Sequence, residues 1–537
     1  MKKYQVLVDK KKAVHNFMGT HQVACVTGAF FGDEAKGKMV DELSKISSAI
    51  ARVNSGENAG HTVYYKKKKF VFHLTPSAVM TKKKTFIGKN CVMDPISFMR
   101  EEIALLIKNK IDYQNLKIGN VFIVHPLHKL VDILRNPNAS TGKGMSAVHQ
   151  DIIAKRGIRL EDFLNKNYTQ LEKSINFWFS HLKRQGLYKR NTLLAIKQNK
   201  KIPPHVKHCS KLTTPSAIIN YVINSVNKIV KNKHFPIITD PQAEMTNLLN
   251  KNKKILLEGS QSFYLSNSEG THYTTSTSAN TNNSGIYASS GLPLNFSIIT
   301  LNVTKVPSSR VGSGANPSGY VEQDWFSKQN LFKKDLEKLD IDFGHSYKLF
   351  LESINKYGQQ KEIPYTSLSG KSIKLNNKII TVNQALAISS CLVYEEFGAT
   401  TGKPRICGSL DLLHLKRALK YQGKYLSITA LDRLDKLSEV LVINKYKYTG
   451  PPKQANGLVY KKGHIITTKN ELPPEEILKY CQPIYKKLAG WQTSKPLNKT
   501  SLDKNLNNFL RYIEKQTKAK IISFGNGPQT KDLVYLK

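Results

Sequence analysis

Two short segments near the N-terminus combine residue types that could do chemistry on a nucleotide. Gly32–Lys38 reads Gly-Asp-Glu-Ala-Lys-Gly-Lys, and Asn58–Thr62 places a histidine among small residues. Glycines let the backbone approach phosphate oxygens, free N–H groups at a helix start point at anions, and lysines add positive charge. Asp33 and His61 could then face one substrate as base and acid. Together the two segments predict a nucleotide-consuming enzyme.

The Gly32–Lys38 segment differs from a Walker A motif, because it lacks the GxxxxGK spacing and has no Ser or Thr after Lys38. An aspartate beside phosphates would repel them. Two roles for Asp33 remove the conflict: holding Mg²⁺, or accepting a proton from a bound base. Taken alone, Asp33 could instead cap a helix and His61 could be a hydrogen-bonded loop histidine.

Three later segments could complete a ligand site. Gly398–Arg405 offers two hydroxyls, glycines and two cations, which suit a carboxylate or a phosphate, although a basic surface loop would look the same. Gln261 follows a predicted strand and could hydrogen-bond a nucleobase edge. Asp432 also ends a predicted strand, where its carboxylate could accept hydrogen bonds from guanine N1–H and the 2-amino group.

The elements that must position these residues alternate between strands and helices. A short apolar run at 22–27 predicts a buried strand, and the spacing of apolar residues over 38–47 predicts the helix after the phosphate turn. Further strands are predicted at 49–53, 121–124, 255–257, 297–303, 425–431 and 521–524. This alternation predicts an α/β fold with a large, mostly parallel, doubly wound sheet and a P-loop-NTPase-like phosphate turn. Ligands should collect at the carboxyl ends of its strands.

The rest of the chain predicts additions to this sheet. Residues 1–21 read as a basic N-terminal extension before one large domain over 22–537, in which 158–250 form a mainly helical subdomain. Residues from about 323 to 380 read as a polar, irregular insertion. Thr62–Tyr65 and Phe70–Phe72 predict a hairpin with a lysine tip. Helices are predicted at 95–108, 385–393, 411–421, 475–488 and 502–516.

Composition leaves two interpretations of the charge. The 537 residues carry a formal net charge of +43, mostly from lysines scattered along the chain. This positive charge could simply reflect coding bias. Alternatively, it could create a field that attracts anionic ligands or nucleic acid. No zinc-finger spacing, RRM signature or helix-turn-helix pattern occurs, so nucleic-acid binding stays the minority hypothesis. Six cysteines without a CxxC pair, and no apolar run of 18 residues, predict a cytoplasmic protein.

Several blocks of the sequence resemble the adenylosuccinate synthetase family and occur in the family's order. They span residues 23 to 530, which is nearly the whole chain, and GDExKGK together with NAGHT is highly specific. The N-terminal extension and the 323–380 insertion lie outside the common pattern. The blocks are GAFFGDEAKGKMVD, NSGENAGHTV, VFHLTPSAVM, ASTGKGMSAVHQDIIAKRGIRLEDF, LLEGSQS, SSRVGSG, EEFGATTGKPRICGSLDLL, LDRLD and FGNGP.

The resemblance implies a GTP-dependent ligation of IMP and L-aspartate to adenylosuccinate through 6-phosphoryl-IMP. Asp33 would remove the N1 proton of IMP and ligate Mg²⁺, the IMP O6 would attack the γ-phosphoryl of GTP, and the aspartate amine would displace phosphate. His61 would act as general acid. The implied catalytic residues are Asp33, His61, Lys36 and Gln261, and Mg²⁺ is the implied cofactor, held by Asp33 and the Gly60 carbonyl.

The resemblance also implies binding residues. For IMP they are Asn58, Thr141, Lys155, Gln261, Ser276 and Lys403. For L-aspartate they are Ala399, Thr400, Thr401, Gly402, Lys403 and Arg405. For GTP they are Gly32, Asp33, Glu34, Ala35, Lys36, Gly37, Lys38, Gly60, His61, Thr62, Arg405, Ala430, Leu431, Asp432, Gly525, Asn526 and Gly527. Lys155 stands where the family has an arginine that reaches IMP from the partner subunit, so a homodimer with shared sites is implied.

Departures from the family pattern keep alternatives open. Lys155 and Lys403 replace arginines, Ala35 replaces a glycine, Ala430 replaces the lysine that packs on guanine, and Thr530 replaces an arginine. The phosphate donor could therefore be ATP or dATP instead of GTP. A phage-type 2-aminoadenylosuccinate synthetase that uses dGMP is an alternative, although members of that group replace the motif aspartate retained here. A further alternative is a basic nucleic-acid-binding protein that keeps the synthetase fold but has lost its catalytic activity.

Overall fold

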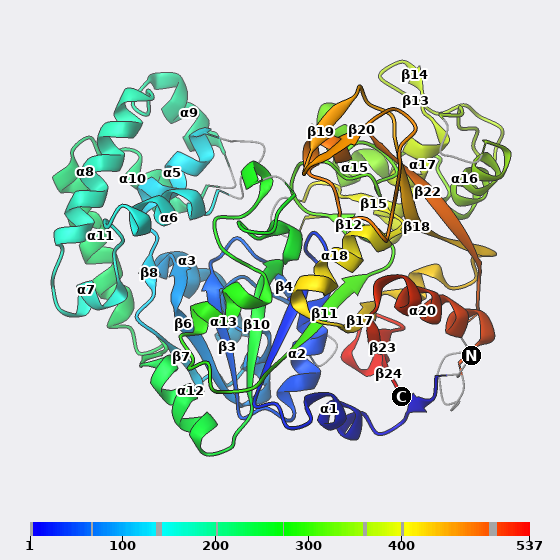
Figure 1. Cartoon of the computed structure of the whole chain (residues 1–537). Coiled ribbons are helices and arrows are strands. Elements are labelled where there is room, and N and C mark those ends of the chain that lie inside the picture. The colour runs from blue at the N-terminus through cyan, green and yellow to red at the C-terminus, as the bar shows by residue number, and fades with distance from the viewer. Residues whose placement is uncertain are drawn as a thin grey trace.

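A mostly parallel sheet of 12 strands forms the centre of the computed structural model, which describes residues 4–65, 68–135, 142–199, 202–271, 273–357, 362–398, 402–492 and 502–537 (Figure 1). All its pairs are parallel except the two that β24 makes. The order is β1 (Val6–Leu7), β24 (Leu533–Leu536), β23 (Lys520–Gly525), β17 (Tyr425–Thr429), β11 (Ile298–Lys305), β2 (Val23–Gly28), β10 (Ile255–Ser262), β3 (Ala49–Ser55), β6 (Lys84–Met93), β7 (Leu116–Ile118) and β9 (Ile237–Ile238), with β8 (Phe122–Ile123) on β6.

Helices cover both faces of this sheet, as the alternation of strands and helices predicts. Alternate residues of β2 enter different cores: Ala24 and Val26 pack with helices α1 (Lys10–Met18) and α2 (Lys36–Ser44), because side chains of a strand point to opposite faces in turn. Val23 and Cys25 pack on the other face, where helices α12 (Pro241–Asn250) and α13 (Asn283–Ser290) lie. The doubly wound α/β fold is therefore confirmed.

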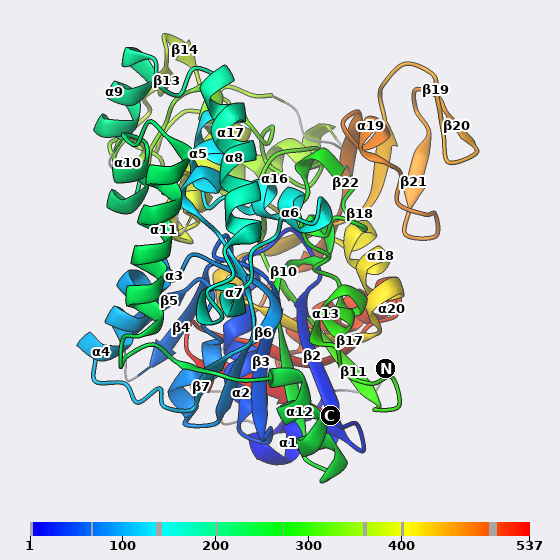
Figure 2. The ribbon, with the colours of Figure 1, turned by 90° about the vertical axis from the view of Figure 1, so that its left-hand side faces the viewer.

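A group of helices stands above the carboxyl ends of β6 and β8 (Figures 1 and 2). The predicted 95–108 helix is α3 (Pro95–Phe98), a π-turn η2 (Met99–Ile103) and α4 (Ala104–Lys108). The group's apolar faces meet around the fully buried Trp178 in one core. Its members are α5 (Pro126–Arg135), α6 (Met145–Ile153), α7 (Leu160–Leu164), α8 (Thr169–Arg184), α9 (Arg190–Gln198), α10 (Pro204–Cys209) and α11 (Pro215–Val230).

The segment predicted to be irregular is folded. It holds α14 (Trp325–Lys328), α15 (Lys333–Leu336), α16 (Phe343–Tyr357), β13 (Lys374–Leu375) and β14 (Lys378–Ile379). Helix α16 buries one face against α17 (Val382–Val393). The expectation of an irregular segment was wrong because apolar residues recur at helical spacing between its polar ones, at Tyr347, Phe350, Leu351 and Ile354.

A second, smaller sheet corrects another prediction. Residues 475–488, predicted as one helix, form a single turn α19 (Glu475–Leu478) followed by strand β22 (Cys481–Ala489). The strand pairs antiparallel with β18 (Glu439–Tyr448) along its length, so long-range pairing overrides local helix propensity. Strands β16 (Leu410–Asp411) and β21 (Ile465–Thr467) complete this sheet, and the hairpin β19 (Lys453–Ala455)–β20 (Leu458–Tyr460) projects from the molecule in Figure 2.

The remaining predicted elements lie close to their expected places. The hairpin is β4 (His61–Tyr65) with β5 (Lys68–Phe72), its tip outside the described residues. Two helices are α18 (Leu412–Gln422) and α20 (Lys504–Thr517). Short elements near the cavity are β12 (Ser308–Arg310), β15 (Ile406–Gly408) and the 3-10 turns at Ser77–Thr81, Phe263–Leu265, Tyr273–Thr275, Leu431–Leu434 and Thr530–Asp532.

The N-terminal segment and the cysteines are both integrated into the fold. Strand β1 pairs with β24, so the two ends of the described chain lie together (Figure 1). All six cysteines are buried and unpaired with one another. Within the residues described, no helix combines the length and apolar character that a membrane crossing requires.

Candidate active site

A cavity of about 790 Å³ opens at the carboxyl ends of the central parallel strands, the place predicted for a doubly wound sheet. The turn after β2, the turn after β3 and the end of β10 form one side. The end of β11, the segment before β15 and the end of β17 form another. The turn after β23 closes the far end, and residues of α14 reach the rim.

The Gly32–Lys38 turn lies at the centre of the cavity wall in a constrained backbone. Asp33 and Ala35 both have left-handed φ angles of 57° and 63°. Buried Glu34 braces the turn from below: it accepts the Gly32 N–H at 2.8 Å, and its second oxygen lies 3.0 Å from the Lys36 ammonium. Burial alone would raise the pKa of Glu34, but Lys36 and the Ser262 hydroxyl outweigh it and lower that pKa. The turn is thus preorganised, with Asp33 facing the cavity.

His61 is fixed by a buried carboxylate. Its Nδ1 contacts Glu258 on β10, and its Nε2 lies 2.8 Å from the Ser260 carbonyl. Glu258 is held in turn by the main-chain N–H of Ser77 at 2.8 Å and by the hydroxyl of that serine. Burial is the main reason that the pKa of His61 lies below its usual value. Glu258 therefore sets the ring orientation of a histidine that lines the cavity.

Four charged side chains converge beside Asp33. Lys305, at the end of β11, lies 3.7 Å from Asp33 Oδ2, and Arg405 contacts the same oxygen. Glu396 accepts Lys305 at 2.8 Å on both oxygens and Arg433 at 2.6 Å. Burial would raise the pKa of Glu396, but Lys305 and Arg433 outweigh it and lower that pKa to about 2. Glu396 is thus an ionised hub that holds cations at the cavity wall.

Gln261 and Asn58 present amides to the same cavity. Gln261 Oε1 accepts the hydroxyls of Ser260 at 2.8 Å and Ser55 at 3.1 Å. Its Nε2 is buried without a hydrogen-bond partner among the described residues. An unsatisfied buried donor at a cavity wall is suited to a ligand acceptor. Asn58 Nδ2 donates to Thr277 Oγ1 at 3.3 Å.

The far end of the cavity joins the phosphate turn to the last loop. Lys38 Nζ donates to the Gly527 carbonyl, and burial lowers the pKa of Lys38 to about 8. Ala430 and Asp432, which follow β17, line this end with Gly527. Ala430 has a left-handed φ of 62°. Gly525 lies next to Ala430: a Cβ added to Gly525 would be 3.5 Å from the backbone nitrogen of Ala430.

The structure brings most of the predicted site residues to this one cavity. Those that line it are Gly32, Asp33, Ala35, Lys36, Gly37, Lys38, Asn58, Gly60, His61, Thr62, Gln261, Lys403, Arg405, Ala430, Asp432 and Gly527. Glu34, Lys155, Ser276, Gly402, Leu431, Gly525 and Asn526 do not line it. Lys155 is exposed at the end of α6. Thr141, Ala399, Thr400 and Thr401 lie outside the described residues.

Sequence reasoning missed several charged residues at the cavity. Lys305, Arg310, Glu396 and Arg433 line it, and Glu258 lies behind His61. Weak signals were present, since Lys305 follows the strand predicted at 297–303 and Glu258 directly follows the strand predicted at 255–257. Ion pairs between segments far apart in sequence have no local pattern, so only the fold reveals them.

A family model described as adenylosuccinate synthetase matches residues 25–534. The chain belongs to the adenylosuccinate synthetase family. Adenylosuccinate synthetase 2 of Trypanosoma cruzi is 39% identical over 96% of this chain and 88% of that protein. Adenylosuccinate synthetase of Trypanosoma brucei brucei is 37% identical over 100% of this chain and 93% of that protein. The family relationship thus covers the whole cavity.

A solved structure of an adenylosuccinate synthetase shares this fold. The fully ligated adenylosuccinate synthetase of Plasmodium falciparum matches with a TM-score of 0.64 at 22% identity, over 95% of this chain and 99% of that one. A cyanophage S-2L succinoaminodeoxyadenylate synthetase, bound to dGMP and dATP, matches with a TM-score of only 0.45 at 12% identity. That likeness is too distant to support the phage-type alternative.

A His–His–Asp cluster in the helical group has the composition of a metal site, but its aspartate is already held by protein donors. His125, His128 and Asp151 place their ligand atoms within 4.8 Å of one another. The Asp151 carboxylate accepts Trp178 Nε1 at 2.9 Å and lies 2.8 Å from His128 Nε2, and the Arg156 guanidinium is 2.9 Å away. A guanidinium beside the carboxylate disfavours a second cation. We interpret the cluster as a structural hydrogen-bond network.

Proposed function

We propose that this adenylosuccinate synthetase family member ligates IMP and L-aspartate to adenylosuccinate with GTP as phosphate donor. The observation that carries the proposal is the convergence of Asp33, His61 and the unsatisfied Gln261 amide on one cavity. A base, an acid and a nucleobase-binding donor are what the reaction requires. Cationic side chains from four segments of the chain line the same cavity.

The residues have distinct roles in this proposal. Asp33 accepts the N1 proton of IMP, and O6 then attacks the γ-phosphorus of the donor as the bond to the β–γ bridging oxygen breaks. In the second step the aspartate amine forms a bond to C6, and the O6-linked phosphate leaves. His61, oriented by Glu258, donates a hydrogen bond or proton to the transferring group. Gln261 orients the purine.

Charge neutralisation is the largest task, because phosphoryl transfer depends on positioning and electrostatics. Lys36, Lys305 and Arg405 supply it from three elements. Asp33 and the Gly60 carbonyl both line the cavity and are hard oxygen donors, which fit Mg²⁺. Mg²⁺ bound there would neutralise phosphate charge. Lys403 and Arg405 suit the carboxylates of aspartate.

Asp432 supports GTP as the donor, because its carboxylate lines the end of the cavity beyond Lys38 and could accept two guanine N–H groups. We further propose a homodimer. Lys155 is exposed at the end of α6 and away from its own cavity, which is consistent with a contact to IMP bound by a partner subunit. We thus propose that the substrates are small molecules. We also propose that the protein is cytoplasmic.

A substrate and donor panel tests the proposal. The purified protein is offered IMP or dGMP, with GTP, ATP or dATP, plus L-aspartate and Mg²⁺, and products are separated by chromatography. We expect adenylosuccinate from IMP with GTP, and loss of turnover when EDTA removes Mg²⁺. Turnover of dGMP but not IMP would instead support the phage-type alternative. Salt-dependent DNA binding without any ligation would support the nucleic-acid-binding alternative.

A further inference from the structure

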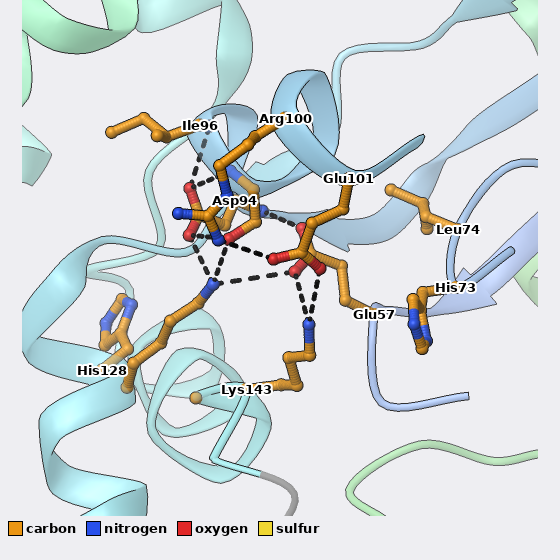
Figure 3. Close-up of polar contacts among 12 residues, drawn as sticks. Glu57, His73, Leu74, Asp94, Ile96, Arg100, Glu101, His128 and Lys143 are labelled. Carbon is orange, nitrogen blue, oxygen red and sulfur yellow. Dashed lines mark hydrogen bonds and ion pairs between the residues drawn. The ribbon is translucent and has the colours of Figure 1, made fainter. Parts of the chain in front are cut away.

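A buried carboxylate lies directly before Asn58. Glu57 follows β3 and is only 2% exposed. Its Oε1 accepts the main-chain N–H of Asp94 at 2.8 Å, and its Oε2 lies 3.7 Å from Lys129 Nζ and 3.9 Å from Lys143 Nζ. Figure 3 shows the Lys143 side chain pointing toward Glu57 and Glu101. The carboxylate therefore joins the end of β3 to the end of β6, to α5 and to the turn before α6.

The lysines around Glu57 have other partners. Lys129, which is fully buried, contacts Asp94, and Asp94 Oδ2 also lies 2.7 Å from His205 Nε2. Lys143 Nζ lies 3.2 Å from Glu101. Glu57 is therefore not needed to neutralise either lysine, although burial makes its ionisation costly and raises its pKa to about 7. The ionisation of this buried carboxylate is costly, and its neighbouring lysines are paired with other carboxylates. Glu57 is therefore better explained by the backbone turn that it positions.

The turn that Glu57 fixes leads straight to the cavity. Ser55 has a left-handed φ of 64°, and a Cβ on Gly56 would lie 2.7 Å from the Met145 sulfur, so the turn packs tightly on α6. The Ser55 hydroxyl donates to Asn58 Oδ1 at 3.2 Å, and Thr277 accepts the Asn58 amide. Side-chain contacts thus orient the Asn58 amide, while Glu57 anchors its backbone.

We propose that Glu57 is a positioning residue for IMP binding, because it anchors the turn that presents Asn58 to the cavity. The inference rests on the proposed function and deepens it. Glu57 itself lies behind the cavity wall and does not line it. Its effect should therefore appear in the affinity for IMP and pass through Asn58.

A double-mutant cycle at pH 8 tests this, with Glu57→Gln, Asn58→Ala and the double variant. Glutamine keeps the shape of the side chain but weakens its contacts to Lys129 and Lys143, which tie the turn to α5 and to the segment before α6. We expect Glu57→Gln to raise KM for IMP by about 10-fold with kcat within about twofold, and the double variant to be no worse than Asn58→Ala. The KM values for GTP and L-aspartate should stay unchanged. Glu244→Gln is the matched control, because Glu244 pairs with Lys117 at 2.8 Å outside this network.

Several outcomes would overturn the inference. They are an unchanged KM for IMP in folded Glu57→Gln, or additive effects of the two substitutions. If Glu57→Gln does not fold, Lys143→Met decides in its place. That variant removes one contact of Glu57 and leaves Lys129 paired with Asp94. An unchanged KM for IMP in this variant would contradict the positioning role of Glu57. A wild-type protein that does not turn over IMP would defeat the proposed function instead, before any variant is compared.

Discussion

The Nζ atom of Lys305 lies 3.7 Å from Oδ2 of Asp33, so the proposed base faces a cation before any substrate arrives. Arg405 contacts the same carboxylate oxygen, and Glu396 lies behind both cations. Binding of phosphates and of the aspartate carboxylates offers these cations new partners. In the proposed mechanism, this exchange of partners would release Asp33 toward the purine when the substrates bind.

Lys305→Met should lower kcat by about 100-fold, because it removes one preorganised cation from the site of developing phosphate charge. Steady-state kinetics with IMP, GTP and L-aspartate measure this. Lys420→Met is the control, since Lys420 is paired with Glu471 on the surface. Equal effects of the two substitutions would contradict a role for Lys305 in the reaction.

Glu258→Gln should lower kcat through His61. An amide keeps the hydrogen bond but does not stabilise a protonated ring, so we expect a smaller loss than for His61→Ala, which should cost roughly 10²–10⁴-fold. The double variant should be no worse than His61→Ala alone, as for residues that act as a unit. Additive losses in that double variant would show that Glu258 acts independently of His61.

Asp432→Asn should weaken the choice of GTP over ATP. The carboxylate accepts two guanine donors in our proposal, and an amide places a donor against one of them. We expect kcat/KM for GTP to fall by at least about 10-fold, with little change for ATP. The ratio of the two kcat/KM values is the measurement. An unchanged ratio would place donor selection elsewhere in the cavity.

Glu57→Gln should become more stable relative to wild type as pH rises. Burial is the main reason that the folded-state pKa of Glu57 rises from 4.5 to about 7. The Lys129 ammonium lowers this pKa and the Asp94 carboxylate raises it, both by smaller amounts. The neutral carboxyl thus contributes stability fully below pH 4.5, and this contribution is lost as pH rises through 7, by about 3 kcal/mol. Thermal unfolding of both proteins at pH 5.5 and pH 8 measures the difference in Tm. A constant difference in Tm would show that Glu57 does not titrate in this range.

Much of the fold follows from local pattern. The buried strand at 22–27 and the helix after the phosphate turn were predictable, because a strand buried on both faces and an amphipathic helix each leave a clear signal. Residues 481–489 were not, since β22 owes its form to β18, which precedes it by more than thirty residues. Pro483 within that segment was a signal against a helix interior.

The site was predictable where chemistry is local and not where charges meet across segments. Asp33, His61 and Gln261 stand in recognisable sequence motifs and line one cavity. Lys305 and Glu396 lie 91 positions apart and meet only in the fold. Glu34 is predicted as a nucleotide contact from its motif position, and in the structure it is buried beside Lys36 and does not line the cavity.

The segment from about 323 to 380, which we predict to be an insertion, also has a consequence for ligand design. Gln323 donates from this segment to the Gly312 carbonyl at 2.7 Å, and Asp324 and Ser327 reach the cavity rim. A compound that fills the cavity and extends to this rim would contact Asp324 and Ser327 as well as the residues of the phosphate turn. The rim would therefore give such a ligand contacts outside the residues proposed to carry out the reaction.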